Sequence, residues 1–174
     1  TVRLVRAPSL ARWLTPVHGG IAATSQTFTA GRVLLVQFHI ADACLVDGLA
    51  YVVGSNSAGN VTGGIVGPVS RTSDSAVTAA VLAQSASTAQ GTANTLQLLT
   101  WTGVYAAPGI YYAALEGSDA AGTYMRLGNQ IQASGIGSLY DRGGGYGTLT
   151  SPTPAVTETG SALHLMVREL LKAD

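Results

Sequence analysis

The segment TLQLLTWTGVYAAPGIYYAAL, residues 95–115, contains two runs of aliphatic and aromatic residues on either side of Ala107-Pro108-Gly109. Residues of this kind are enriched in β-strands. Proline fixes φ near the value of the first turn position, and glycine accepts the positive φ that the next position of a type II turn requires. The segment therefore predicts two antiparallel strands, Thr95–Trp101 and Ile110–Leu115, that meet at a corner.

Other segments of the chain also have the period of strands. Arg32–Ile40 alternates strongly, and Ala162–Leu171 alternates again near the end of the sequence. Residues two apart in a strand share a face, so each run has an apolar side. Eight or nine such segments at regular spacing, with no sustained helical period, predict an all-β fold, an antiparallel β-sandwich of jelly-roll type. In the strongest strand the apolar side consists of Leu34, Val36, Phe38 and Ile40.

Turn-forming residues predict where the strands are interrupted. Ser55–Gly64 and Arg71–Ser75 are predicted as loops, and Gly48 is predicted to mark a bulge within a strand. Val77–Gln84 has alanines that suit a helix, but its Val and Thr residues favour a strand. Ala133–Pro154 is rich in glycine and dotted with aromatic residues, which predicts mostly loop.

Residues 1–20 differ in composition from the rest, and we expect an extended N-terminal arm followed by a β-sandwich domain of residues 21–174. Two prolines exclude one continuous helix in the arm. Ser9–Leu14 is compatible with a single helical turn, and the alternative to an arm is a first strand at Val2–Val5. Arg and Trp are favoured at protein interfaces, so we expect assembly contacts from Arg3, Arg6, Arg12 and Trp13.

The charge content of the chain is low. Charged residues make up 10% of the sequence, against about 25% in an average soluble protein. Nine basic and nine acidic residues give a net charge of zero. No basic patch is implied, so we expect no nucleic-acid binding, and no apolar run reaches the ~18 residues that span a bilayer. A neutral, charge-poor surface suits a homo-oligomer. We expect this oligomer to be a trimer.

Two blocks of sequence carry a family resemblance. Pro108-Gly109 followed by IYYAAL resembles the "PAGTYYLAL"-type strand of β-sandwich domains in bacteriophage tail, fibre and spike proteins. Between Arg32 and Val69, a strand, the run VDGLAYVV from Val46, an AGN loop and a returning GIV strand are similar to the order "VD-x-L-x-x-x-V", "aGN" and glycine-apolar strand in the same domains. The blocks cover roughly half of the chain. The resemblance implies a sandwich fold and a virion setting, and it transfers no site residue.

Local motifs for catalysis or metal binding are absent from the sequence. His18, His39 and His164 are isolated, with no H-x-H, H-E-x-x-H or C-x-x-C spacing. No G-x-S-x-G nucleophile elbow occurs. Asp42 and Asp47 are the closest approach to a glycosidase carboxylate pair, but two carboxylates near a strand end are weak support for that chemistry. We therefore expect no enzyme, no metal site and no cofactor.

Aromatic residues with polar neighbours indicate a candidate saccharide site. An aromatic ring offers an apolar face to a sugar ring, while Asp and Arg can bind hydroxyl or acidic groups. The alternative is that Trp101 and Tyr112 are core residues and that the tyrosines of the 140–146 loop anchor that loop. The candidate glycan contacts are Tyr140, Asp141, Arg142, Tyr146, Trp101 and Tyr105.

Two functions fit these observations. The first is a structural protein of a phage-like virion, a fibre, spike or tail component on the surface of the extracellular particle. It would form a homo-oligomer, bind other virion proteins and contribute to recognition of a host-surface saccharide. The alternative is a free-standing carbohydrate-binding, lectin-type module. A trimer or higher ring in solution favours the first function, and a monomer with sugar affinity favours the second.

Overall fold

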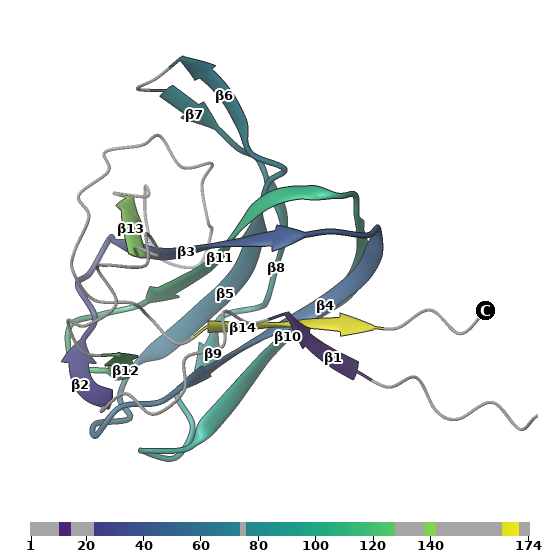
Figure 1. The fold of residues 1–174 in the computed structure, drawn as a ribbon. Coiled ribbons are helices and arrows are strands. Elements are labelled where there is room, and N and C mark those ends of the chain that lie inside the picture. The colour runs from purple at the N-terminus through teal and green to yellow at the C-terminus, as the bar shows by residue number, and fades with distance from the viewer. Residues whose placement is uncertain (1–10, 15–22, 74–75, 128–137, 142–164, 171–174) are drawn as a thin grey trace, which may run out of the picture.

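The computed structural model describes residues 11–14, 23–73, 76–127, 138–141 and 165–170, and every regular element in these ranges is a β-strand (Figure 1). The prediction of an all-β antiparallel sandwich is confirmed. The strands are β1 (Ala11–Leu14), β2 (Ala23–Thr27), β3 (Val33–Ile40), β4 (Cys44–Val52), β5 (Asn60–Val66), β6 (Ser70–Ser73), β7 (Ala76–Thr78), β8 (Val81–Gln84), β9 (Thr88–Ala89), β10 (Leu96–Ala106), β11 (Gly109–Gly117), β12 (Thr123–Leu127), β13 (Ser138–Asp141) and β14 (Leu165–Leu170).

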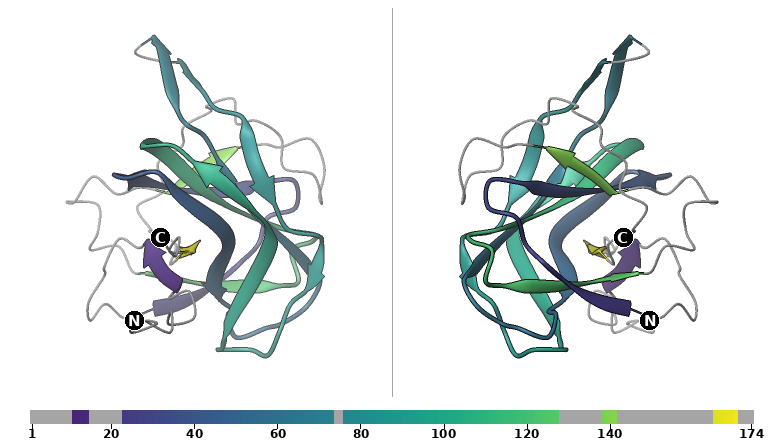
Figure 2. Two further views of the ribbon diagram at one scale, coloured as in Figure 1. Left: turned by 90° about the vertical axis from the view of Figure 1, so that its right-hand side faces the viewer. Right: turned by 90° about the vertical axis from the view of Figure 1, so that its left-hand side faces the viewer.

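Two sheets form the body of the molecule. The first sheet has the order β1-β14-β4-β10, and the second has the order β13-β3-β11-β5-β8, with β9 also pairing with β5. Two smaller ladders, β2-β12 and β6-β7, complete the fold. The β6-β7 hairpin projects from the body in each view (Figures 1 and 2).

The strand pairings are nested along the chain. β1 pairs with β14, β2 with β12, β3 with β11, β4 with β10, β5 with β8, and β6 with β7, all antiparallel. Each pair therefore encloses the next, as in one long hairpin whose tip is β6-β7. Additional pairings, β14 with β4 and β11 with β5, join separate parts of this hairpin into the two sheets.

The main core lies between the two sheets. Leu49 and Leu99 of the first sheet and Ile65 and Leu115 of the second are at most 1% exposed. Gly63 on β5 faces this core: a Cβ built there would lie 2.7 Å from Cδ1 of Leu99 and 2.9 Å from Cδ2 of Leu49. The absence of a side chain at position 63 therefore lets the two sheets approach closely.

The second sheet is buried on its other face as well. Val33, Leu35 and Tyr112 belong to a second apolar cluster on that face. Glu116 and Thr62 are fully buried and lie opposite each other in the β11-β5 register. The strict apolar-in, polar-out alternation predicted for β3 thus holds for its exposed Gln37 and His39 but not for the start of the strand, which is buried on both sides.

The corner predicted at Ala107-Pro108-Gly109 is present. β10 ends at Ala106 and β11 begins at Gly109, but the two strands belong to different sheets and pair with other strands instead of with each other. The hydroxyl of Tyr111 donates a hydrogen bond to the carbonyl of Ala107 across the corner, at 2.9 Å. Burial is the main cause that raises the pKa of Tyr111 above its ordinary value.

Several predicted boundaries are wrong. Arg71–Ser75 was expected to be a loop, but Ser70–Ser73 is β6. The predicted loop Ser55–Gly64 overlaps β5, which begins at Asn60. Gly63 and Gly64 are buried strand residues and do not form a turn. The predicted strand Val77–Gln84 is divided between β7 and β8.

The N-terminal segment and the glycine-rich segment are described only in part. Ala11–Leu14 is strand β1 and pairs with β14, so the predicted helical turn is wrong over these residues. The alternative strand at Val2–Val5 lies outside the described residues. Within the predicted loop Ala133–Pro154, the described part, Ser138–Asp141, is strand β13 at the edge of the second sheet.

Candidate functional site

The outer face of the first sheet, the face turned away from the second sheet, contains two adjacent rows of apolar positions. The register places Leu96 opposite Val52, and Leu98 opposite Ala50, which in turn lies opposite Met166. The intervening rows, such as Leu99 with Leu49, face the core. Because side chains alternate across a strand, the first set lies on the outer face.

The strand β10 carries the most exposed apolar side chains of this face. Leu96 is 53% exposed, Leu98 39% and Tyr105 68%. Single exposed apolar residues are ordinary on protein surfaces, but contiguous ones mark interaction sites. Leu96 and Leu98 are neighbours on this face, and Tyr105 lies further along the same strand, so this face is the best candidate for binding among the described residues.

Glycines on or beside this face are covered by its larger side chains. A Cβ at Gly48 would lie 3.3 Å from Cδ1 of Leu98 and 3.6 Å from Nε of Arg168, so these two side chains lie over the glycine. Leu45 covers Gly103 in the same way, with its Cδ2 3.2 Å from a built Cβ. The side chains of Leu98, Arg168 and Leu45 thus lie flat against the sheet and do not project far from the outer face.

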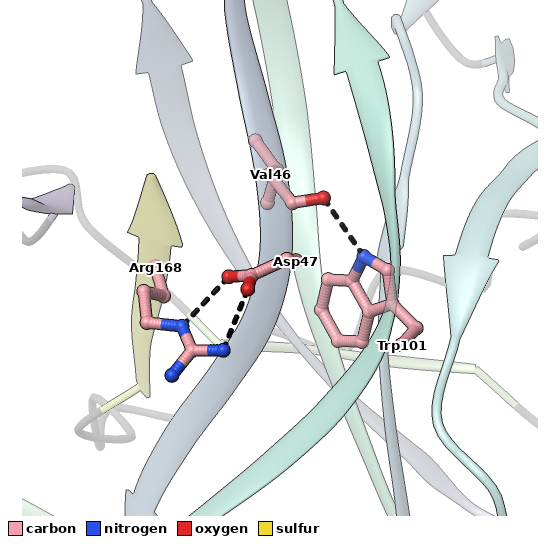
Figure 3. A network of polar contacts seen from close by, with 4 residues as sticks. All are labelled: Val46, Asp47, Trp101 and Arg168. Atoms are coloured by element: carbon pink, nitrogen blue, oxygen red, sulfur yellow. Dashed lines mark hydrogen bonds and ion pairs between the residues drawn. The ribbon is translucent and has the colours of Figure 1, made fainter. Parts of the chain in front are cut away.

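One ion pair crosses the outer face. Arg168 on β14 donates from Nε to Oδ1 of Asp47 at 2.7 Å and from Nη2 to Oδ2 at 2.6 Å (Figure 3). The side chains are 22% and 13% exposed, respectively. The bond to Asp47 raises the pKa of the Arg168 guanidinium, so the cation is held in its charged form. The two charges cancel each other on this face.

A bulge in β4 creates this arrangement. Asp47 is the extra residue of β4 between Val46 and Gly48, and β10 has three residues between the paired Thr100 and Val104. The bulge predicted at Gly48 is therefore confirmed, with the neighbouring Asp47 as its extra residue. The indole Nε1 of Trp101, the first of the three extra residues, donates a hydrogen bond to the Val46 carbonyl at 3.1 Å (Figure 3).

The predicted glycan residues lie in two different sheets. Trp101 and Tyr105 are on β10, whereas Tyr140 and Asp141 are on β13 at the edge of the second sheet. Trp101 is half-buried and packs against the main core, as the structural alternative predicted, while Tyr105 is exposed. Tyr112 is also buried. Arg142 and Tyr146 lie outside the described residues.

The predicted assembly residues Arg12 and Trp13 lie on β1, at the opposite edge of the first sheet from β10. The register places Trp13 opposite Arg168 and Arg12 opposite Glu169, a buried carboxylate. Trp13 is therefore in register with Arg168 and Gly48. Arg3 and Arg6 are not among the described residues.

A polar network that the sequence did not predict holds the loops at one end of the sandwich. The hydroxyl of buried Tyr51 donates to Oε1 of Gln97 at 2.8 Å and accepts from Nε2 of Gln90 at 3.1 Å. The same Gln90 amide donates to the Thr123 carbonyl at 3.0 Å. These partners are 33 to 46 residues apart, so no local motif reveals them. We interpret the network as structural.

The turn before β12 is closed by Asp119. Its Oδ1 accepts a hydrogen bond from the backbone N–H of Ala121 at 2.8 Å, and its Oδ2 accepts one from the Ser118 hydroxyl at 3.2 Å. The backbone bond is the main cause that lowers the pKa of Asp119. This geometry is that of an Asx turn, in which an Asp side chain bonds its own backbone two residues on.

The described residues contain no group of three or more His, Cys, Asp or Glu side chains that could hold a metal ion. Asp47, considered above with Asp42 as a carboxylate pair, is bound to Arg168. No helix suited to crossing a membrane occurs in the part of the chain that the structure describes.

No protein-family model matches the chain, and no curated protein matches it.

Proposed function

We propose that this chain is a structural protein of a phage-like virion, a component of a fibre, spike or tail that assembles as a homo-oligomer. The observation that carries the proposal is the apolar outer face of the first sheet, with Leu96 and Leu98 exposed on a chain in which only 10% of residues are charged. A face of this kind suits a protein that is covered by neighbours in an assembly. The trimer remains our preferred oligomer, and other virion proteins are the further partners.

The strand order supports a jelly roll as the form of this sandwich. Jelly rolls consist of eight strands in two packed sheets with Greek-key connections and occur in viral capsid proteins. Here the nested pairs β1-β14, β3-β11, β4-β10 and β5-β8 supply eight strands, four to each sheet. Fold alone does not determine function, so this point supports the virion setting only together with the outer face.

The resemblance to phage sandwich domains falls on elements of the body. The IYYAAL block lies within β11, at the centre of the second sheet, and the VDGLAYVV block covers most of β4, including the bulge that carries Asp47. Both strands have partners on each side. The resemblance is therefore to the framework of the sandwich, and the particle surface is the location that it favours.

Recognition of a host-surface saccharide is the second part of the proposal. Tyr105, 68% exposed at the end of β10, is the residue that supports it, because an exposed ring offers the flat apolar face that a sugar stacks on. Replacement of Tyr105 by Ala should reduce attachment to host cells and leave the oligomer intact. Loss of the oligomer instead would assign Tyr105 to assembly. If neither attachment nor the oligomer changed, Tyr105 would have no part in saccharide binding or in assembly. The same test applies to Tyr140 and Tyr146.

Labelling of particles tests the virion proposal. An antibody raised against the purified chain should bind intact phage-like particles at one defined position, such as the tail tip or a fibre. Absence of the chain from purified particles, together with a monomeric protein that binds saccharides, would favour the free carbohydrate-binding module. Removal of residues 1–10, which precede β1, should weaken assembly while the sandwich stays folded, if the predicted arm contacts a neighbour.

A further inference from the structure

We propose that the outer face of the first sheet meets the same face of other copies of this chain, around a shared symmetry axis. The inference deepens the proposed function, because it rests on the homo-oligomer and names the surface that forms it. Leu96 and Leu98 lie on this face with 53% and 39% of their surfaces exposed. Burial of these side chains between copies removes apolar surface from water, which is the main driving force of protein association.

The charges of the face allow it to approach its own copy. Its charged side chains among the described residues are Asp47 and Arg168, which neutralise each other within one chain. A face with net charge would repel an identical face. Because the ion pair is closed internally, both groups also keep their hydrogen bonds when water is displaced, and neither needs a partner from the second copy.

The dimensions of the face suggest a contact at the small end of the specific range. Its strands have 4, 6, 9 and 11 residues, which gives a sheet plane of about 480 Å² at about 3.3 Å per residue and about 4.8 Å per strand. This plane is an upper limit to the exposed face, because Ala50 and Gly48 in its middle are buried within one chain. Two such faces bury at most about 1,000 Å², near the lower limit for a specific interface. The face alone should therefore give a weak, concentration-dependent association, to which other segments of the chain add.

The shape of the face also fits the packing of one sheet on another. Leu98 and Arg168 lie over Gly48, and Leu45 lies over Gly103, so no long side chain stands on the middle of the sheet at these positions. Sheets pack face to face at about 10 Å when their side chains interdigitate. A low apolar face can reach this spacing without rearrangement of the backbone.

Charge complementation at Leu98 tests the inference. Near a symmetry axis, Leu98→Glu places like charges close together, and so does Leu98→Arg. At a protein concentration where the wild type is oligomeric, each variant alone should have the monomer mass of 17.7 kDa, and an equimolar mixture of the two should recover the oligomer. The matched controls are Gln37→Glu and Gln37→Arg on β3, since Gln37 is exposed on the second sheet. These controls should retain the wild-type mass.

The folded state and the alternatives are tested in the same experiment. Because Leu98 is 39% exposed in one chain, the charged variants should keep the circular dichroism spectrum and thermal midpoint of the wild type within a few degrees. Unchanged oligomers of both Leu98 variants would overturn the inference. Monomeric variants that do not recover on mixing would also overturn it, because the face would then meet a different surface. In either case particle labelling still decides the virion proposal independently.

Discussion

Removal of one partner of the Asp47–Arg168 pair should weaken the pairing of the two inner strands of the first sheet, because this pair joins β14 to the bulge of β4. Arg168→Met keeps most of the side-chain stem and removes the charge, and Asp47→Asn keeps the shape of the carboxylate. Two charge-assisted hydrogen bonds of 2.7 and 2.6 Å are lost or weakened in each case, and the remaining partner is at most 22% exposed.

The magnitude follows from this partial burial. Hydrogen bonds to charged groups contribute about 1.5–3 kcal/mol, whereas breaking a fully buried pair costs about 3–5 kcal/mol. Since water reaches part of both side chains, we expect each single variant to lose about 2 kcal/mol of unfolding free energy. For a domain of this size, that corresponds to a fall of about 4–8 °C in the thermal midpoint.

A double-mutant cycle provides the assay. Urea unfolding of the wild type, both single variants and the double variant should show that the double variant costs less than the sum of the singles, with a coupling of about 1–2 kcal/mol. Arg32→Met is the control, because the Arg32 side chain makes no ion pair with the described residues, and it should stay within about 0.5 kcal/mol of the wild type. Additive single effects, within about 0.5 kcal/mol, would refute the account of the pair.

Three further predictions concern the sandwich and its loops. Gly63→Ala should cost about 1–3 kcal/mol by urea unfolding, because its methyl group meets Leu99 at 2.7 Å, whereas Gly91→Ala, with its nearest atom at 3.6 Å, should be nearly neutral; equal effects would contradict the sheet packing. Trp101→Phe should cost about 1 kcal/mol in the same assay, since the Val46 carbonyl loses its indole donor, and no loss would mean that this bond adds nothing. Asp119→Asn should lower the thermal midpoint at pH 7. Because the folded-state pKa of Asp119 is depressed, the carboxylate stabilises the fold above its unfolded pKa, and this stabilisation is lost as pH falls through the folded pKa. A difference in thermal midpoint between variant and wild type that persists below both pKa values would contradict this cause.

The elements that the sequence predicted well are those whose residues carry a local signal. The corner between β10 and β11 was visible because Pro108-Gly109 separates two apolar runs, and the core face of β3 followed from its period of two. The bulge in β4 was indicated by Gly48, a residue that weakens a regular ladder. In each case the signal and the structure involve the same few neighbouring residues.

The elements that the sequence missed depend on contacts between distant segments. Glycines 63 and 64 have the composition of a turn, but Gly63 is a residue of strand β5. A glycine is needed there because Leu99, from another strand, occupies the space that a side chain would fill. The partners Asp47 and Arg168 are 121 residues apart. In Leu96-Gln97-Leu98-Leu99, the period of two separates the faces, yet only the pairing with β4 determines that Leu99 is buried and Leu98 exposed.

The same limit applies to the candidate site. The sequence directed attention to Trp101 and Tyr105 as stacking residues, and the structure separates them: one packs on the core and the other is exposed. The apolar outer face was not predicted, because its members come from strands whose order in the sheet is set by the nested pairing and not by their order in the chain.

The mass of the wild-type protein in solution tests the central claim most directly. Sedimentation equilibrium over a wide range of protein concentrations should give a mass that rises from the monomer value of 17.7 kDa to a fixed multiple of it, with three as the expected multiple. A protein that remains at the monomer mass at every concentration, up to the millimolar range, would contradict both the assembly proposed for this chain and the role of its outer face.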